Sequence, residues 1–99
     1  MLYVIFGEDA PGTAASRAAA REQHLARLET LKAEGRLILA GPFPAIDASD
    51  PGPAGVTGSL IVAEFDSLEA ASDWADSDPY VAAGVYQRVD VRPFRKVLP

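Results

Sequence analysis

The most regular pattern in the chain is the run VYQRVDVRPF at residues 85–94. Its odd positions from Val85 to Val91 are mostly valine, and its even positions from Tyr86 to Phe94 are charged or aromatic. Side chains of a strand alternate between the two faces of its sheet. The run therefore predicts a strand that places one face on an apolar core and the other on a polar, partly aromatic environment.

Three further runs predict strands, at residues 1–7, 36–42 and 58–65. The first is apolar almost throughout, so we expect it to be buried on both faces. The second is expected to end at Pro42, because proline has no amide N–H to donate to a neighbouring strand. In the third, the odd positions from Ser59 to Phe65 share one face.

Two helices are expected between these strands. Ser16 is a suitable N-cap for the first, which then runs to about Glu34 and is followed by a glycine suited to a left-handed cap. The second begins after Ser67 or the aspartate before it. It stops at Asp78, because the proline that follows disfavours helical geometry in the preceding residue. A further short turn over residues 79–83 leads into the last strand.

The resulting order is β-α-β-β-α-β, which is an α+β fold of the ferredoxin-like type. Two helices are predicted to cover one face of a four-stranded antiparallel sheet, in a single domain over residues 1–99. A chain of 99 residues is too short to cover the other face as well. We therefore expect a homodimer in which two sheets face each other.

Composition narrows the classes of function. The formal net charge is −5 and only one lysine precedes residue 90, so neither nucleic acid nor an anionic membrane is an expected partner. The absence of cysteine excludes disulfides, a thiolate zinc site, a cysteine nucleophile and the iron–sulfur cluster of an electron-transfer ferredoxin. No apolar run is long enough for a membrane helix, and the N-terminus does not resemble a signal peptide, so a cytoplasmic location is expected.

His24 is the only histidine, and the helical spacing places it on or beside the apolar stripe of the first helix. One interpretation is a packed histidine whose hydrogen bonds are satisfied locally. The other is a general base, which needs a second group to orient it. Asp78, at the end of the second helix, is the first candidate for that partner and Asp76 is the alternative. A carboxylate beside an imidazole holds its tautomer and raises its basicity. Either aspartate can equally be a helix-end carboxylate that binds backbone N–H groups.

Three other residues are candidates for binding a small molecule. Ser59, at the head of the third strand, can donate a hydrogen bond to a substrate oxygen. Arg17 and Arg21 share the histidine's side of the helix and can hold a carboxylate, or they can simply be surface arginines. A single histidine without cysteine does not favour a zinc site, and the aspartates of the 43–57 connection are too sparse for calcium. No cofactor or metal is therefore expected.

Several segments together carry a family resemblance. They are MLYVI at 1–5, REQHL at 21–25, EGRL at 34–37, AGP at 40–42, Gly58-Ser59, ADSDPY at 75–80 and VRPF at 91–94. Their order and spacing resemble the YciI-like (YCII-related) family along essentially the whole chain, and the long loop is similar to that of the enterobacterial YciI type. The resemblance implies a dimeric α/β barrel and an active site centred on a histidine and an aspartate. By motif these are His24 and Asp78, and Ser59 matches the strand serine near the pocket.

Two hypotheses of function follow. The first is a small cofactor-independent enzyme in which His24, oriented by Asp78, transfers a proton on a small anionic or carbonyl substrate. Its reaction would be an isomerisation, a lyase-type elimination or a related dehalogenation. The second is a non-catalytic dimer that binds a metabolite or serves as an accessory module, in which the two residues form a buried structural pair.

Overall fold

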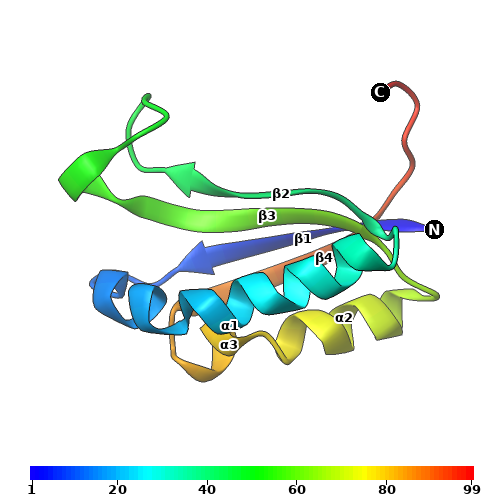
Figure 1. Cartoon of the computed structure of the whole chain (residues 1–99), viewed down its shortest axis with the longest axis horizontal. Coiled ribbons are helices and arrows are strands. Elements are labelled where there is room, and N and C mark those ends of the chain that lie inside the picture. The colour runs from blue at the N-terminus through cyan, green and yellow to red at the C-terminus, as the bar shows by residue number, and fades with distance from the viewer.

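The computed structural model describes residues 1–99 and contains a four-stranded sheet with helices on one face (Figure 1). The elements are β1 (Leu2–Asp9), α1 (Ala14–Ala33), β2 (Leu37–Pro44), the 3₁₀ turn η1 (Gly52–Ala54), β3 (Val56–Glu64), α2 (Leu68–Asp76), α3 (Pro79–Ala82) and β4 (Tyr86–Phe94). The strand order is β2-β3-β1-β4, and every neighbouring pair is antiparallel. The predicted βαββαβ ferredoxin-like fold is confirmed, with α3 as a short addition between α2 and β4. None of the helices combines the length and apolarity needed to cross a membrane.

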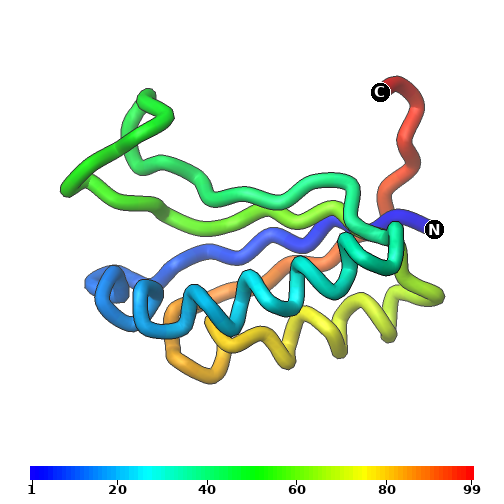
Figure 2. The backbone as a smooth tube through the Cα atoms, in the orientation of Figure 1, coloured from blue at the N-terminus to red at the C-terminus, as the bar shows by residue number.

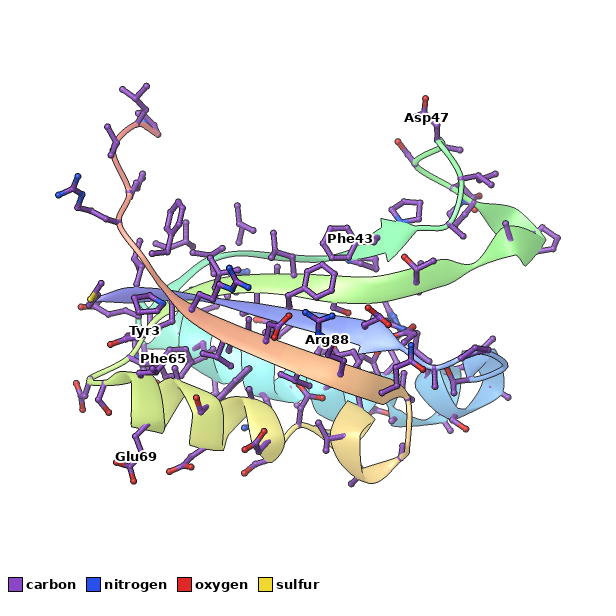
Figure 3. All side chains as sticks on the ribbon, turned by 180° about the vertical axis from the view of Figure 1, so that it is seen from behind. Tyr3, Phe43, Asp47, Phe65, Glu69 and Arg88 are labelled. Carbon is purple, nitrogen blue, oxygen red and sulfur yellow. The ribbon has the colours of Figure 1, made fainter.

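The core lies between the sheet and the two long helices, which Figure 2 shows running along one side of the sheet. β1 and β3 form the middle of the sheet and contribute Tyr3, Ile5, Ile61 and Ala63. The apolar stripes of the two helices contribute Leu28, Leu31, Ala71 and Ala75. Figure 3 shows Tyr3 and Phe65 between the sheet and α2, where their rings meet edge to face. This packing fixes α1 against the sheet and so fixes the side chains that α1 directs toward β3 and α3.

Several predicted boundaries were wrong: β1 continues beyond Gly7 to Asp9, and β3 begins at Val56 rather than at Gly58. α1 begins at Ala14 rather than after Ser16, and Thr13 precedes it with its hydroxyl bonded to the Ala10 carbonyl instead of capping the helix. β2 continues through Pro42 to Pro44. It pairs only with β3, so it is an edge strand, and an edge strand tolerates a proline whose missing N–H faces solvent.

β4 departs from simple alternation at its start. Glu8 pairs with Arg88 and Asp9 pairs with Tyr86, so Gln87 is an extra residue in a β-bulge. The bulge moves Tyr86 to the helix-covered face, where its ring packs over Gly7; a Cβ at that glycine would overlap the ring. The prediction that Tyr86 shares the outer face with the charged residues of β4 was therefore wrong.

The other face of the sheet is open. β1 does not bury both of its faces in a single chain, because Phe6 on this side is 36% exposed whereas Ile5 on the helix side is 3% exposed. Phe6 stacks against Phe43 of β2, with ring centroids 5.2 Å apart. Figure 3 shows Phe43 and Arg88 on this face, opposite the helices. The outer side of the sheet thus presents apolar rings beside charged side chains of β4.

Candidate active site

His24 and Asp78 are in contact across the boundary between α1 and α3. His24 Nδ1 lies 2.8 Å from Asp78 Oδ2 and 3.0 Å from Oδ1, although the residues are 54 positions apart in sequence. Both side chains are almost fully buried, with exposed fractions of 6% and 2%. The Asp-Pro-Tyr sequence explains the placement of the carboxylate. The proline holds Asp78 in an extended conformation and begins α3, and Asp78 caps that helix by accepting from the Tyr80 amide at 2.8 Å.

Two further side chains fix the imidazole and its carboxylate. The ring of Tyr80 stacks on His24, with centroids 4.1 Å apart and planes inclined by 18°. Arg27 places Nη1 3.8 Å from Asp78 Oδ2 while Nη2 donates to the carbonyl of Trp74. Burial lowers the pKa of Arg27, and the carboxylate of Asp78 opposes that effect. Tyr80 therefore packs on one face of the His24 ring. Asp78 binds Nδ1, and Arg27 lies beside the carboxylate of Asp78.

The arrangement leaves Nε2 as the ring nitrogen of His24 that has no partner within the protein. Because Nδ1 is engaged by Asp78, the ring presents its other nitrogen away from that contact. Nε2 makes no hydrogen bond within the protein, yet it is not among the polar atoms sealed from solvent without a partner. His24 lines a cavity of about 230 Å³ between α1 and the β2–β3 edge of the sheet. The cavity walls also include Arg17, Arg21, Ser59 and Tyr80.

Arg17 connects the cavity to the end of β1. Its Nε donates to Asp9 Oδ2 at 2.8 Å, and its Nη2 donates to Ser59 Oγ at 2.5 Å. The guanidinium also lies over the ring of Tyr80, 4.5 Å from the centroid. Burial alone would lower the pKa of Arg17, but the hydrogen bond and the charge of Asp9 outweigh it and raise the pKa. Arg17 is therefore a fixed cation whose hydrogen bond orients Ser59.

Tyr86 is a third hydroxyl beside this network. Its oxygen is buried without a hydrogen-bond partner, and its ring meets Tyr80 edge to face at 5.5 Å. Burial raises the pKa of Tyr86 to about 12, although the nearby Ser59 hydroxyl lowers it somewhat. Burial also raises the pKa of Tyr80, and the charges of Arg17 and Arg21 oppose it. Both phenols are therefore neutral at ordinary pH.

The remaining candidates from the sequence are placed apart from this cluster. Asp76, the alternative partner for His24, is exposed at the end of α2 and makes no hydrogen bond or ion pair. Arg21 lines the cavity but makes no hydrogen bond or ion pair either. No group of three or more histidine, aspartate or glutamate side chains is arranged to hold a metal ion.

Sequence reasoning missed Asp9, Tyr80 and Tyr86 as neighbours of the site. Tyr80 belongs to the same Asp-Pro-Tyr triplet as Asp78, and a proline-started turn directly after the carboxylate is a signal that its next residues lie close by. No local sequence pattern marks Asp9 as a partner of Arg17, because the contact depends on β1 extending as far as residue 9. Tyr86 was assigned to the wrong face of the sheet. The bulge at Gln87 changes the face of Tyr86 only, and the residues from Arg88 onward still alternate as expected, so the sequence pattern does not reveal it.

The strand order β2-β3-β1-β4, with helices on one face of the sheet, places the chain among small proteins of the dimeric α/β-barrel fold. The chain belongs to the YCII-related domain family, which matches residues 1–95. It is 60% identical over 97 residues to Protein YciI of Escherichia coli and to Protein YciI of Shigella flexneri. Each comparison covers 98% of this chain and 99% of the relative. The resemblance predicted from the sequence motifs is confirmed.

Solved structures give the same fold. The chain is similar to the 5-chloro-2-hydroxyhydroquinone dehydrochlorinase TftG of Burkholderia phenoliruptrix, in complex with 2,5-dihydroxybenzoquinone. The two superpose with a TM-score of 0.83 at 28% identity, over 96% of this chain and 94% of that one. A structure of PA3566 from Pseudomonas aeruginosa superposes with a TM-score of 0.53 at 13% identity, over 98% and 93% of the two chains, which is a likeness of fold alone.

Proposed function

We propose that this protein is a small enzyme that moves a proton on a substrate bound in the His24 cavity. His24 Nε2 acts as the general acid and base, and Asp78 holds the ring and stabilises the imidazolium formed when Nε2 takes a proton. The observation that carries the proposal is the geometry of the ring. The carboxylate engages Nδ1, so the opposite nitrogen is left free on a residue that lines a cavity.

Ser59 is the group we assign to a substrate oxygen. Its oxygen already accepts a hydrogen bond from Arg17, so its own proton is available to a substrate in the cavity that Ser59 lines. A hydroxyl that accepts from a cation is a better donor, because the positive charge draws electron density from its oxygen. Ser59 is thus suited to stabilise the oxygen of an enolate, with Arg17 as the residue that positions and polarises it.

These roles define a class of reaction. Nε2 removes a proton beside a carbonyl, the electron pair moves onto the carbonyl oxygen, and Ser59 binds that oxygen. Return of the proton at a different carbon gives an isomerisation, and loss of a leaving group from the enolate gives an elimination or a dehalogenation. No oxidant, reductant or cofactor enters these steps. The similarity to a dehydrochlorinase bound to a dihydroxybenzoquinone supports a small cyclic carbonyl or enol substrate.

We further propose that two copies of the chain associate through the open faces of their sheets. Val4, Phe6, Phe43 and Phe94 supply exposed or half-exposed apolar surface on this side. Charges of both signs lie beside them on β1 and β4, including the Arg88–Asp90 ion pair of 2.7 Å, so the face can complement itself across a twofold axis. Light scattering should give a mass near twice that of the monomer for the wild-type protein, and that of a monomer for Phe6→Glu.

A second candidate function is a dimeric binding module in which His24 and Asp78 are structural. The observation that favours it is the near-complete burial of both side chains. The enzyme and the binding module would have the same structure, but only the enzyme would transfer a proton on a bound molecule. A panel of enol lactones, muconolactones and chlorinated hydroquinones in D₂O separates them, with ¹H NMR reporting exchange, isomerisation or loss of chloride.

If the protein is an enzyme of this class, the wild type should accelerate proton exchange, isomerisation or loss of chloride for at least one compound of this panel. That acceleration should fall by at least roughly 100-fold in His24→Gln, since a positioned acid or base contributes about 10²–10⁴-fold. An unchanged rate in His24→Gln, or no acceleration by the wild-type protein, would favour the binding module.

A further inference from the structure

A second and larger cavity adjoins the one that contains His24. It measures about 600 Å³ and is bordered by residues 9–14, by the first turns of α1 and by residues 53–57. Arg17, Arg21 and Pro42 line both cavities, so the inner cavity opens into the outer one at these three residues. Figure 1 shows the N-terminal end of α1 and the connection between β2 and β3 at the same end of the molecule.

The inner cavity is small for a complete ligand site. Its volume of about 230 Å³ lies below the roughly 300–1,000 Å³ that is usual for sites of small molecules. A substrate whose reacting atom reaches His24 therefore has room for a small ring or carbonyl group there, and its remaining part extends past Arg21 into the outer cavity.

Arg21 is the source of the net positive charge of the two cavities, because the charge of Arg17 is paired. The chain as a whole is acidic, with a formal net charge of −5, but the only acidic side chain that lines either cavity is Asp9. Asp9 is paired with Arg17, which also donates to Ser59 and lies over Tyr80. Arg21 has no ion pair and no hydrogen bond with any residue, and it precedes His24 by one helical turn. It is the single uncompensated charge at the junction of the cavities.

We infer that the substrate carries a carboxylate and that Arg21 binds it at this junction while the enolisable part of the molecule reaches His24 Nε2. The inference rests on the proposed function and adds the substrate class: a small cyclic keto or enol acid rather than a neutral ring. A guanidinium matches a planar carboxylate with two parallel hydrogen bonds, and Arg21 has all of its donors available for it. Arg17 has a different role, since its Nε and Nη2 already donate to Asp9 and Ser59.

The test compares a carboxylate with its neutral counterpart in three proteins. The probes are 2,5-dihydroxybenzoate and 2,5-dihydroxybenzamide, titrated at fixed ionic strength into wild type, Arg21→Gln and Arg95→Gln. Arg95→Gln is the matched control. Arg95 is exposed in the C-terminal tail and has no partner, so its substitution removes the same charge at a position away from both cavities. His24 is the only histidine, so its imidazole ¹⁵N signals report binding at the site without ambiguity.

In wild type and Arg95→Gln, the acid should bind about tenfold more tightly than the amide, as expected for one charge-assisted contact open to solvent. In Arg21→Gln that preference should fall to less than about twofold. Equal affinity for the two probes in wild type would overturn the inference, and so would an equal loss of preference in Arg95→Gln and Arg21→Gln.

The same proteins separate this inference from the proposed function. Catalysed proton exchange on both muconolactone and its methyl ester, with no dependence on Arg21, would retain the acid/base function and overturn the carboxylate assignment. An Arg21-dependent preference for the acid without any catalysed exchange would retain the carboxylate site and refute the enzyme.

Discussion

Replacement of Asp78 by alanine removes two interactions at once. The carboxylate caps α3 through the Tyr80 amide, and loss of an N-cap costs about 0.5–2 kcal/mol. It also accepts from His24 Nδ1, and leaving that buried donor unpaired costs about 1–3 kcal/mol. The free energy of unfolding of Asp78→Ala should therefore fall by about 1.5–5 kcal/mol, which lowers the Tm of a domain of this size by roughly 6–25 °C.

Asp78→Asn separates the charge from the hydrogen bonds. Asparagine is as good an N-cap as aspartate, and its amide oxygen still accepts from His24, so its cost should be about 1 kcal/mol. Catalysed proton transfer should nevertheless fall at least about tenfold in Asp78→Asn, because a neutral amide does not stabilise an imidazolium.

The assay is urea unfolding followed by far-UV circular dichroism, with the exchange reaction measured on the same samples. The matched control is Asp76→Ala, which removes a carboxylate two positions away that has no partner. Its stability should change by less than about 0.5 kcal/mol, and it should not lose activity. Equal destabilisation by Asp76→Ala and Asp78→Ala would mean that the contacts of Asp78 with His24 and Tyr80 contribute nothing to stability.

Three further predictions concern the residues around the cavity. Tyr86→Phe should remove a pH dependence of stability. The pKa of Tyr86 in the folded protein, about 12, lies above its ordinary value near 10. The contribution of the neutral phenol to wild-type stability is therefore complete below pH 10 and is lost as the pH approaches 12. Between pH 9 and 12, urea melts should show wild type losing up to about 2 kcal/mol more than Tyr86→Phe, a value reduced for partial solvent exposure; parallel pH profiles would contradict the burial of the phenol. Gly7→Ala should cost about 1–3 kcal/mol because its Cβ overlaps the Tyr86 ring, and the cost should shrink in a Tyr86→Leu background; full additivity in that double-mutant cycle would count against the contact. Asp9→Asn should cost about 2 kcal/mol in urea melts, since it leaves Arg17 half-buried without its ion pair, and a neutral result would show that solvent replaces the pair.

Much of the fold was predictable because its signals are local. Alternation and β-branched runs mark the four strands, and the proline after Asp78 marks both the end of α2 and the start of α3. The errors arose where pairing partners decide the outcome. Pro42 continues a strand because β2 is at the edge of the sheet, and neither an edge position nor a bulge is encoded in the strand's own residues.

The site was less predictable than the fold. Helical periodicity placed His24 on the buried stripe, and the family resemblance selected Asp78, but spacing alone did not distinguish Asp78 from Asp76. The different environments of Arg17 and Arg21 also have no sequence signal, since the two residues lie one turn apart on the same helix. Only the folded positions of Asp9 and Ser59 engage the first arginine and leave the second free.

¹⁵N NMR of the His24 imidazole, with and without 2,5-dihydroxybenzoate, tests directly whether Asp78 engages Nδ1 and leaves Nε2 open to a ligand. We expect a proton on Nδ1 that is protected by Asp78, and an Nε2 resonance that moves when the probe is added while Nδ1 changes little. An Nε2 signal that is indifferent to every concentration of the probe, or a proton fixed on Nε2 with Nδ1 unprotonated, would contradict this expectation.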